Sequence, residues 1–340
     1  GTIADVVPLD RNNRILVQNG LLRMRAGRVR PGIKALCESA DRSLDRLSAA
    51  DLGYGLGPRL NAAGRLDDIS VGIKCLLADE LAEARAYAKT LGDLNQTRRQ
   101  IEQDMSTEAL MIMSEVPTDL SGITLYDPNW HQGVIGIVAS RMREKYHRPV
   151  VVFADSGVSN AKLIKGSGRS VSRVHIRDAF ENIATRNPGL IETFGGHAMA
   201  AGLTIKRIHL ELFSNAFSKE VELQADERDL RGIALSDGEL AESELVLESA
   251  LRIAQFGPWG QGFDEPRFHG TFEVVHQRSV GNGRHLKLVL RVQSHLLDAI
   301  AFNQEHVASS KIKVFYRLDI NYFGSAPTLQ LMIENIETVS

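Results

Sequence analysis

The sequence predicts a fold of class α/β plus β: a helical segment, one long helix, an α/β unit with a mixed sheet, and a final unit of five strands. Three observations predict this class. One long stretch repeats its apolar residues at helical spacing, strands and helices then alternate, and short alternating strands finish the chain. A chain of 340 residues also exceeds the usual size of one domain. We expect the divisions to be 1–78, 79–117, 118–226 and 227–340.

The first division is expected to be mainly helical with glycine-rich turns, although its opening GTIADVV reads as a strand that gives way to a loop. From Asp79 to Glu115, apolar residues recur every three, four or seven positions, which predicts one helix that stops near Pro117. These apolar residues are Leu81, Ala84, Ala88, Leu91, Leu94, Ile101, Met105 and Ala109. Such a helix is about 50 Å long at 1.5 Å per residue. A rod of that length usually connects two bodies.

The third division alternates strands and helices. GITLYD reads as a strand, HQGVIGIVASRMREKY as a helix with small residues on its packing side, and RPVVVFAD as a buried strand, which together predict a β-α-β crossover. Further helices are expected around IRDAFENIA and HLELFSNAFSKEVELQA, with a strand after FGGHAMAAG. The sheet should therefore be parallel or mixed.

Five alternating strands follow the acidic connection ADERD. They are RFHGTFEVVHQRSVG, RHLKLVLRVQ, LLDAIAFN, KIKVFYRLDINYF and TLQLMIENIETV. Five strands of this length fit a small closed barrel, and the oligonucleotide-binding (OB) barrel is the leading candidate.

Composition excludes several classes of protein. The net charge of -2 is not that of a strongly basic nucleic-acid-binding chain, and no apolar run approaches the ~20 residues that span a bilayer. Cys37 and Cys75 form no CxxC pair, which argues against a zinc or disulfide framework and suits a reducing compartment. We therefore expect a cytoplasmic protein without a membrane association. Because GTIADVV lacks a starting methionine, we also expect that a longer protein precedes it.

WHQGVIG places His131 at the start of a predicted helix that follows a strand. Backbone N–H groups and the positive end of the helix dipole make that position favourable for an anion. A histidine that only caps the helix is the alternative.

KGSGRS is the second candidate segment, read as a glycine-rich loop. Gly168 and its neighbours allow close approach, Ser167 supplies a hydroxyl, and Arg169 supplies a guanidinium suited to phosphate oxygens. The spacing is not that of a Walker loop, and a plain surface turn is the alternative. In TFGGHAMAAG, Gly195 and Gly196 permit a sharp turn beside His197. Strand ends of one sheet are expected to bring these segments together.

GPRLNAAGR is the third candidate segment. Arg59, Asn61 and Arg65 are spaced so that a helical turn can present two guanidiniums and an amide, although salt bridges to Asp67 or Asp68 are the competing account.

A complete metal site is absent from the sequence, which contains no DHH triplet and no HExxH. Asp5 stands where the opening strand is expected to end, a position that can serve a divalent cation. Taken alone, it reads as a turn residue.

Taken together, GTIADVVPLDRNNRIL, LGPRLNAAGRLDD, WHQGVIGIVASR, GSGRS and FGGHAMAAG strongly resemble the RecJ family of the DHH phosphoesterase superfamily, over essentially the whole chain. GGHAMAAG and RLNAAGR are the most specific of these phrases. The resemblance implies the end of a catalytic DHH domain, a connecting helix, a DHHA1 domain and a C-terminal OB barrel. It also implies a 5′-to-3′ exonuclease that hydrolyses single-stranded DNA to mononucleotides in repair and recombination.

In that family two divalent ions, Mn²⁺ or Mg²⁺, are held by aspartates and histidines of several N-terminal motifs. Only the last of these motifs is present here, as GTIAD, so Asp5 is the candidate ligand and this chain alone is expected to show little or no hydrolysis. The missing motifs would precede the first residue.

The resemblance also implies roles for the other candidates. Ser167, Gly168 and Arg169 would hold a terminal 5′ phosphate, helped by Arg59 or Arg65 with Asn61 nearby. The catalytic residues would be His131 and His197. Together with Gly195 and Gly196, they would line the side of the cleft near the scissile phosphate.

Single-stranded DNA with a 5′-phosphorylated end is the implied substrate, and a single-strand-binding protein and a RecQ-type helicase are implied partners of a monomeric enzyme. Two other functions stay open: a module that binds single strands without cutting them, and a small-substrate DHH phosphodiesterase for oligonucleotides or cyclic dinucleotides. The barrel disfavours the second, because a dinucleotide needs no long guide.

Overall fold

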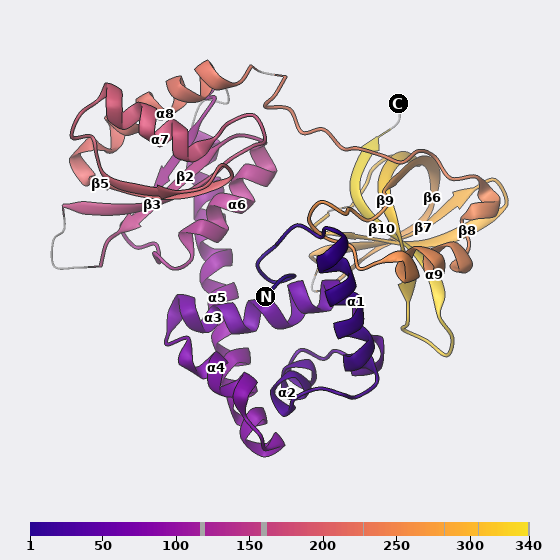
Figure 1. Ribbon diagram of the computed structural model, residues 1–340. Helices are drawn as coiled ribbons and strands as arrows, with labels where there is room; N and C mark the ends of the chain where they lie inside the picture. The colour runs from indigo at the N-terminus through magenta and orange to yellow at the C-terminus, as the bar shows by residue number, and fades with distance from the viewer. Residues whose placement is uncertain (116–119, 158–161, 227, 282, 305, 339–340) are drawn as a thin grey trace. The chain divides into compact units, whose positions relative to one another are not determined.

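The computed structural model describes the following residues: 1–115, 120–157, 162–226, 228–281, 283–304 and 306–338. They form two compact units (Figure 1). The barrel unit consists of Gly1–Val29, Asp41–Gly57 and Ile233–Ser340, and the sheet unit consists of Arg30–Ala40 and Pro58–Gly232. The domain boundaries expected from the sequence stay predictions.

The N-terminal third, up to Glu115, is mainly helical, as predicted. Its helices are α1 (Arg11–Arg25), α2 (Pro31–Ser39), η1 (Leu44–Arg46), η2 (Asp51–Leu56), α3 (Gly57–Leu66), α4 (Ser70–Leu77) and α5 (Leu81–Glu115). The Asp10 carboxylate caps α1 by accepting from Asn13 N–H at 2.8 Å. The strand expected at GTIADVV was wrong. Local hydrogen bonds, such as Asp5 N–H to Gly1 O at 2.9 Å, fold these residues into turns instead.

The predicted long helix is present as α5, which is 35 residues long. Its buried face includes Ala84, Ala88 and Leu91, small or apolar residues against which α2 and α4 pack. The expected stop at Pro117 lies outside the described residues. Gly32 of α2 shows how close this packing is, because a Cβ there would lie 2.0 Å from the Cys75 carbonyl oxygen of α4.

The sheet unit contains a five-stranded mixed sheet in the order β1-β2-β3-β5-β4. Its strands are β1 (Ile123–Tyr126), β2 (Val150–Asp155), β3 (Leu163–Arg169), β4 (Ile191–Gly196) and β5 (Ala200–Lys206). The strands β1 and β2 are parallel and connected through α6 (Ile135–Tyr146), which confirms the predicted crossover. All other neighbouring strands are antiparallel.

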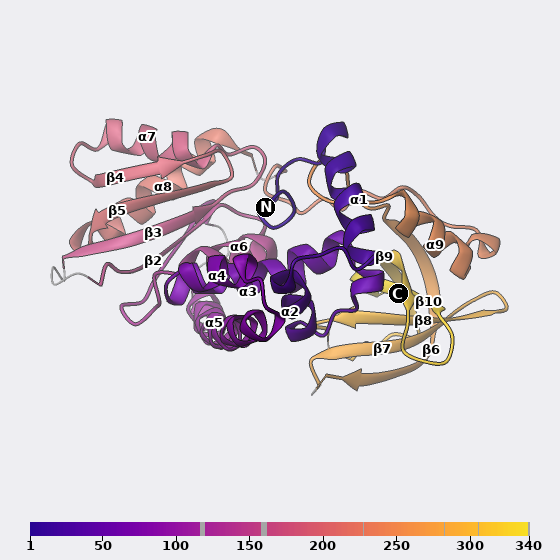
Figure 2. The ribbon, with the colours of Figure 1, turned by 60° about the horizontal axis from the view of Figure 1, so that its bottom comes forward.

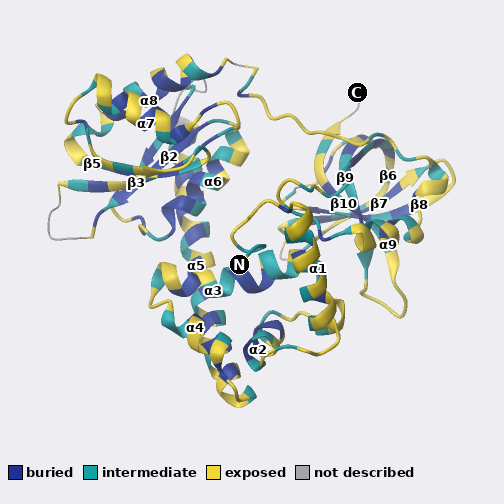
Figure 3. Cartoon of the chain, in the orientation of Figure 1, coloured by how far each residue is buried: buried dark blue, intermediate teal, exposed yellow. Residues whose placement is uncertain are grey.

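Helices cover both faces of this sheet (Figures 1 and 2). α6 packs on one face, where Val150 and Val152 of β2 point into an apolar cluster. α7 (Ile176–Arg186) and α8 (Leu210–Gln224) pack on the other, against Val151 and Phe153. Burial on both faces explains why the central strand β2 is buried along most of its length (Figure 3).

KGSGRS was expected to be a loop, but its residues 165–169 are the second half of strand β3, so that expectation was wrong. Its glycines serve close packing within the sheet. A Cβ at Gly166 would lie 2.5 Å from the Phe153 ring, and one at Gly168 would lie 2.5 Å from Ile176 Cδ1 of α7. No larger residue fits under these neighbours without a shift.

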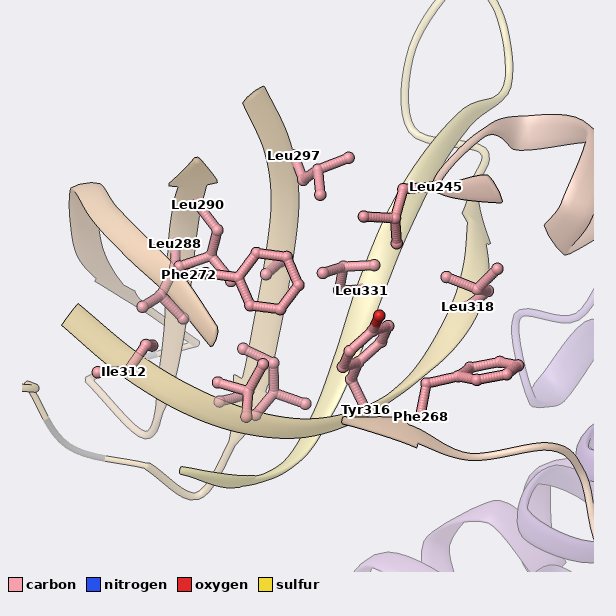
Figure 4. Close-up of a cluster of buried hydrophobic side chains, with 14 of the residues drawn as sticks. Leu245, Phe268, Phe272, Leu288, Leu290, Leu297, Ile312, Tyr316, Leu318 and Leu331 are labelled. Carbon is pink, nitrogen blue, oxygen red and sulfur yellow. The ribbon is translucent and has the colours of Figure 1, made fainter. Parts of the chain in front are cut away.

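The five C-terminal strands close into the predicted barrel, in the order β10-β8-β7-β6-β9. They are β6 (Phe268–Val280), β7 (His285–Val292), β8 (His295–Phe302), β9 (Lys311–Asn321) and β10 (Thr328–Thr338). Alternate residues such as Leu288 and Leu290 point inward (Figure 4), and Leu286 belongs to the same buried cluster. The connection before the barrel contains η4 (Glu242–Glu244) and α9 (Leu247–Phe256); η3 (Arg207–His209) precedes α8. Nowhere in the described segments is a helix both long and apolar enough to cross a membrane.

Candidate functional site

Ser167 and Arg169 lie on the same face of β3, the face that α6 covers. The Arg169 guanidinium donates through Nη1 to Ser167 Oγ at 3.1 Å and to the Gly168 carbonyl at 2.9 Å. Gly136, in the first turn of α6, leaves room for both side chains, since a Cβ there would lie 2.9 Å from Arg169 Nη2 and 3.0 Å from Ser167 Oγ. We call this group, Gly136, Ser167 and Arg169, the Arg169 site.

Arg169 is a partly buried cation, and the charged groups that shift its pKa are also cations. Burial, with the neighbouring Arg65 and Arg143 guanidiniums, lowers the pKa of Arg169. The hydrogen-bond acceptors that it uses are neutral, and none of the ion pairs formed by the described residues includes it. A guanidinium remains charged in this setting. An anion that bound here would therefore remove an electrostatic cost already present in the fold.

Arg65 and His131 meet at the turn before α6. Arg65 donates to the Gly133 carbonyl at 3.1 Å, and Gly133 N–H donates to His131 Nδ1 at 3.1 Å. Because Nδ1 accepts, the proton of a neutral His131 ring is on Nε2. The helix begins at Ile135, so His131 precedes it by a turn and does not cap it. A Cβ at Gly133 would lie 2.3 Å from the Arg65 carbonyl, so the end of α3 presses directly on this turn.

The glycine-histidine segment ends strand β4, with Gly195 and Gly196 as its last two residues, and His197 begins the turn to β5. Gly196 has φ +142, and a Cβ there would lie 2.5 Å from the Ala200 carbonyl, so only glycine fits. His197 N–H donates to the same carbonyl at 2.8 Å, while its ring is on an exposed residue. Ser170, the residue after β3, donates through its N–H to the Met199 carbonyl at 3.0 Å. This bond fixes the turn beside the end of β3, where Arg169 lies.

The other predicted binding residues lie elsewhere. Arg59 donates to the Ser39 carbonyl of α2 at 3.0 Å, and Asn61 is exposed on α3. Gly168 faces α7, opposite to Ser167 and Arg169, and Gly195 has no neighbour within 4 Å of a built Cβ. The structure thus brings together Arg65, His131, Ser167 and Arg169 with the turn that bears His197. The alternative salt bridge from Arg65 to Asp67 or Asp68 is not among the ion pairs of the described residues.

Asp5, the candidate metal ligand, lies in a turn of the barrel unit and is exposed. Across the described segments, no three His, Cys, Asp or Glu side chains are grouped so that they could hold a metal ion. One carboxylate does not make a site for two divalent cations, which need several oxygen ligands each. The residues that the structure describes therefore do not by themselves fit the two divalent metal ions that the resemblance implies.

Sequence reasoning missed the role of Gly136 and the ion pairs that Glu102 forms between α5 and α6. Glu102 of α5 is 3% exposed and binds Arg98 at 2.6 Å and Arg141 of α6 at 2.5 Å, which ties the two helices together. The small residues noted in HQGVIGIVAS were the available signal for Gly136. The spacing of Arg98 and Glu102, one helical turn apart, was the signal for the ion pair.

A second candidate surface is the outer face of β6, β7 and β8 in the barrel unit. Cross-strand pairing aligns Arg278 with Lys287, and His285 with Phe302, on the side opposite the core. The His285 and Phe302 rings are 4.9 Å apart, and Phe302 is half exposed. Lys287 has one acidic neighbour, Asp298 at 3.7 Å. Basic and aromatic groups on one face of a barrel are typical of surfaces that bind single strands.

Comparisons with known proteins match both the part of the chain that forms the mixed sheet and the part that forms the barrel. Residues 119–223 match the family model described as the DHHA1 domain, and residues 236–335 match the model described as the RecJ OB domain. Over 99% of its length the chain is 47% identical to the single-stranded-DNA-specific exonuclease RecJ of Dickeya dadantii (strain 3937). It is 48% identical, again over 99% of its length, to the protein of that name from Escherichia coli (strain K12). The chain spans 60% and 59% of these two relatives.

Solved structures agree with these matches. The crystal structure of RecJ in complex with Mg²⁺ from Thermus thermophilus superimposes with a TM-score of 0.82 and 29% identity, covering 100% of this chain and 51% of that one. The structure of RecJ from the same organism in complex with Mn²⁺ gives a TM-score of 0.82 and 30% identity, covering 100% and 48%. The fold that contains the mixed sheet and the barrel is thus similar to the fold of these two structures.

Proposed function

Because this chain belongs to the RecJ family, we propose that the protein hydrolyses single-stranded DNA from the 5′ end and releases mononucleotides. One observation carries the proposal beyond the family name. Arg169 is a partly buried guanidinium among other cations, with a hydroxyl beside it and a glycine opposite. This combination suits a terminal phosphate, which carries more negative charge than a phosphate within the strand.

The 5′ phosphate is proposed to bind Ser167 and Arg169. Arg169 offers the planar fork that pairs with two phosphate oxygens, and the Ser167 hydroxyl can donate to a third. Arg65 lies near enough to affect the pKa of Arg169, so it adds positive charge on the side of α3. Holding the strand by its end places the first internal phosphodiester at a fixed distance from the site, which accounts for stepwise release of mononucleotides.

His131 and His197 are proposed to contact the phosphate that is cleaved. The bond that His131 Nδ1 accepts from Gly133 leaves Nε2–H as a donor to a phosphate oxygen. His197 is exposed on a turn whose backbone is fixed, so its ring is available to a ligand at low cost in backbone order. Each histidine would stabilise charge that develops on the phosphate during hydrolysis.

Mn²⁺ or Mg²⁺ is the proposed metal, with two ions in the active enzyme, since the matching Thermus thermophilus structures are complexes with these metals. Such ions supply a hydroxide and stabilise the leaving oxygen when they are bound. Asp5 is proposed as one ligand. The described residues alone do not fit the pair of ions.

The barrel is proposed to guide the single strand across the outer face of β6, β7 and β8. Stacking on Phe302 and His285 would contribute about 1–3 kcal/mol per base, independent of sequence. Arg278 and Lys287 would contact backbone phosphates.

The same face favours the second candidate function, a module that binds single strands without hydrolysis. Mononucleotide release by the intact enzyme distinguishes the two. A single-strand-binding protein and a RecQ-type helicase as partners, and a monomeric state, stay predictions.

Arg169→Ala tests the proposed end recognition. The measurement compares the affinity of the chain for oligothymidylates that carry a 5′ phosphate or a 5′ hydroxyl. Arg177→Ala is the matched control, because Arg177 lies on α7, which covers the other face of the sheet. We expect Arg169→Ala to abolish the preference for the phosphate and the control to keep it. If the preference survives in Arg169→Ala, the proposal loses its main support.

A further inference from the structure

A hollow of about 340 Å³ lies between α2, α3 and α5 of the sheet unit, and none of its lining residues belongs to the Arg169 site. Its lining contains three cationic side chains, Arg59, Lys89 and Arg99, and one carboxylate, Asp93. A hollow with this excess of positive charge selects anions over cations and neutral molecules.

Two acidic groups on the same helices, Glu38 and Glu102, pair with cations other than Lys89 and Arg99. Glu38 of α2 is bound to Arg85 at 2.7 Å, and Glu102 of α5 is bound to Arg98 and Arg141. Among the ion pairs that the described part of the chain forms, none involves Lys89 or Arg99. Both side chains are therefore available to a ligand.

Asn95 adds a donor whose orientation is fixed. This residue lines the hollow yet is only 3% exposed. Its Oδ1 accepts from Arg98 Nε at 3.3 Å, and Arg98 is held in turn by Glu102 at 2.6 Å. Since the oxygen is engaged by Arg98, the amide NH2 is the group that Asn95 can offer to a bound molecule.

The shape of the hollow is built by close helix packing. At Gly92 a Cβ would lie 3.0 Å from Ser39 Oγ, so glycine allows α5 to approach α2. Arg59 is held from the other side by its bond to the Ser39 carbonyl at 3.0 Å. The cationic groups are thus supported by rigid helices, which lowers the entropy lost on binding.

We propose that this hollow is a second anion site and that its ligand is a phosphate group. Two guanidiniums, an ammonium and an amide NH2 provide donors to the several oxygens of one phosphate, an arrangement that a halide or a single carboxylate would use only in part. The site differs from the Arg169 site in lying among helices, and nothing in it depends on a free strand end.

The phosphate has two possible sources, a nucleic-acid backbone and a free phosphate or nucleotide. The assignment to a nucleic-acid backbone rests on the proposed function, in which single strands pass over the protein. The affinity of the hollow for phosphate itself does not rest on the proposed function. The two ideas can therefore fail separately, and the experiment uses one probe for each source.

Two variants remove the site in different ways. The double variant Lys89→Ala/Arg99→Ala deletes two of its cations. The matched control is Lys74→Ala/Arg177→Ala, which removes one lysine and one arginine that lie outside the hollow on the same unit. Asn95→Asp keeps the acceptor for Arg98 but replaces the amide NH2 by a carboxylate oxygen that repels phosphate. This second variant keeps the packing, so it answers the case in which the double variant does not fold.

Inorganic phosphate is the first probe, measured as the rise in Tm at constant ionic strength in the Arg169→Ala background, where the Arg169 site does not contribute. An oligothymidylate with a 5′ hydroxyl is the second, measured as affinity over a series of salt concentrations. We expect both site variants to bind phosphate about tenfold more weakly, as loss of charge-assisted hydrogen bonds implies. For the strand, the double variant should lose about 0.7 from the slope of log affinity against log salt, the value for one phosphate contact.

Three outcomes are distinguishable. If both probes weaken in the site variants but not in the matched double control, the ligand is a backbone phosphate. If only inorganic phosphate weakens, the site is supported and its ligand is a free phosphate or nucleotide. If neither probe weakens, or if the matched control weakens equally, the hollow is not a phosphate site.

Discussion

Replacing Gly136 with alanine is expected to weaken recognition of a 5′ phosphate while the fold remains intact. The added Cβ would lie 2.9 Å from Arg169 Nη2, which is 0.5 Å short of the 3.4 Å at which ordinary contact begins, and 3.0 Å from Ser167 Oγ. Both atoms end side chains that can move, so the strain falls on the site and the core is spared. Alanine is also the better helix former, by up to about 1 kcal/mol.

The size of the effect follows from the contact that is lost. A hydrogen bond to a charged group contributes about 1.5–3 kcal/mol, and each 1.4 kcal/mol is about tenfold in affinity. A displacement of about half an ångström is enough to spoil a site of this kind. We therefore expect the preference for a 5′ phosphate over a 5′ hydroxyl to fall by roughly 10- to 100-fold, with a change in the free energy of unfolding of less than about 1 kcal/mol.

The assay is a competition between the two oligothymidylates, paired with thermal unfolding of each variant. Gly20→Ala is the control, because Gly20 lies within α1 and has no neighbour within 4 Å of a built Cβ. An undiminished preference in a folded Gly136→Ala chain would refute the reasoning, since it would mean that the guanidinium does not need its present position. Loss of folding would also contradict it, because the contacts at risk are with flexible side-chain ends.

Three further changes test the local structure. Gly168→Ala places a Cβ 2.5 Å from Ile176 Cδ1 in the core, so the free energy of unfolding should fall by about 1–3 kcal/mol, and an unchanged value would show that α7 yields easily. Gly196→Ala, at φ +142, should cost about 1–3 kcal/mol, whereas Gly195→Ala should be neutral; equal effects would contradict the strain assigned to this turn. Burial raises the pKa of Asp319, so its ionised form opposes folding. Asp319→Asn should therefore be more stable than wild type near neutral pH. This difference should shrink as pH falls through the raised pKa toward the ordinary value of 3.8, as denaturation of both proteins at several pH values would show.

Elements with a regular sequence period were predictable. In β7, Leu286, Leu288 and Leu290 occupy every second position, and most of the residues between and beside them are polar, so the strand has the inward and outward faces that this period predicts. The apolar spacing in α5 likewise predicted a helix whose observed start differs by two residues from the expected one. In both cases neighbouring residues supply the signal, so a single sequence is enough.

Glycine was ambiguous, because the same residue marks a sharp turn and a tight contact. In GGH, Gly195 and Gly196 are the last residues of strand β4, and the predicted turn begins only after Gly196, whose φ is positive. KGSGRS is a strand because Gly166 and Gly168 lie beneath Phe153 and Ile176, which are distant in the sequence. Local pattern does not contain those neighbours. GTIADVV was wrong for a related reason: its apolar residues resemble a strand, but no partner strand pairs with them among the described residues.

Long side chains limited the prediction of the site. Arg59 and Arg65 share α3, yet one binds a carbonyl of α2 and the other a carbonyl before α6. Their spacing on a helix suggested one phosphate site, and the packing of α2 and α5 separates them into two regions. Which carbonyl a guanidinium reaches depends on helix packing, and composition and spacing do not determine it.

The arrangement of charge gives a reason why the fold should respond to an anion. Arg65 and Arg169 repel one another, and Arg98 is also within the influence of Arg65. Burial lowers the pKa of Arg98, and the neighbouring Arg99 and Arg65 lower it further, although the bond to Glu102 acts in the opposite direction. A fold that retains this cost gains more from a bound phosphate than a neutral surface does. Ligand binding should therefore raise the Tm of the sheet unit more at low salt than at high salt, because screening weakens both the repulsion and its relief.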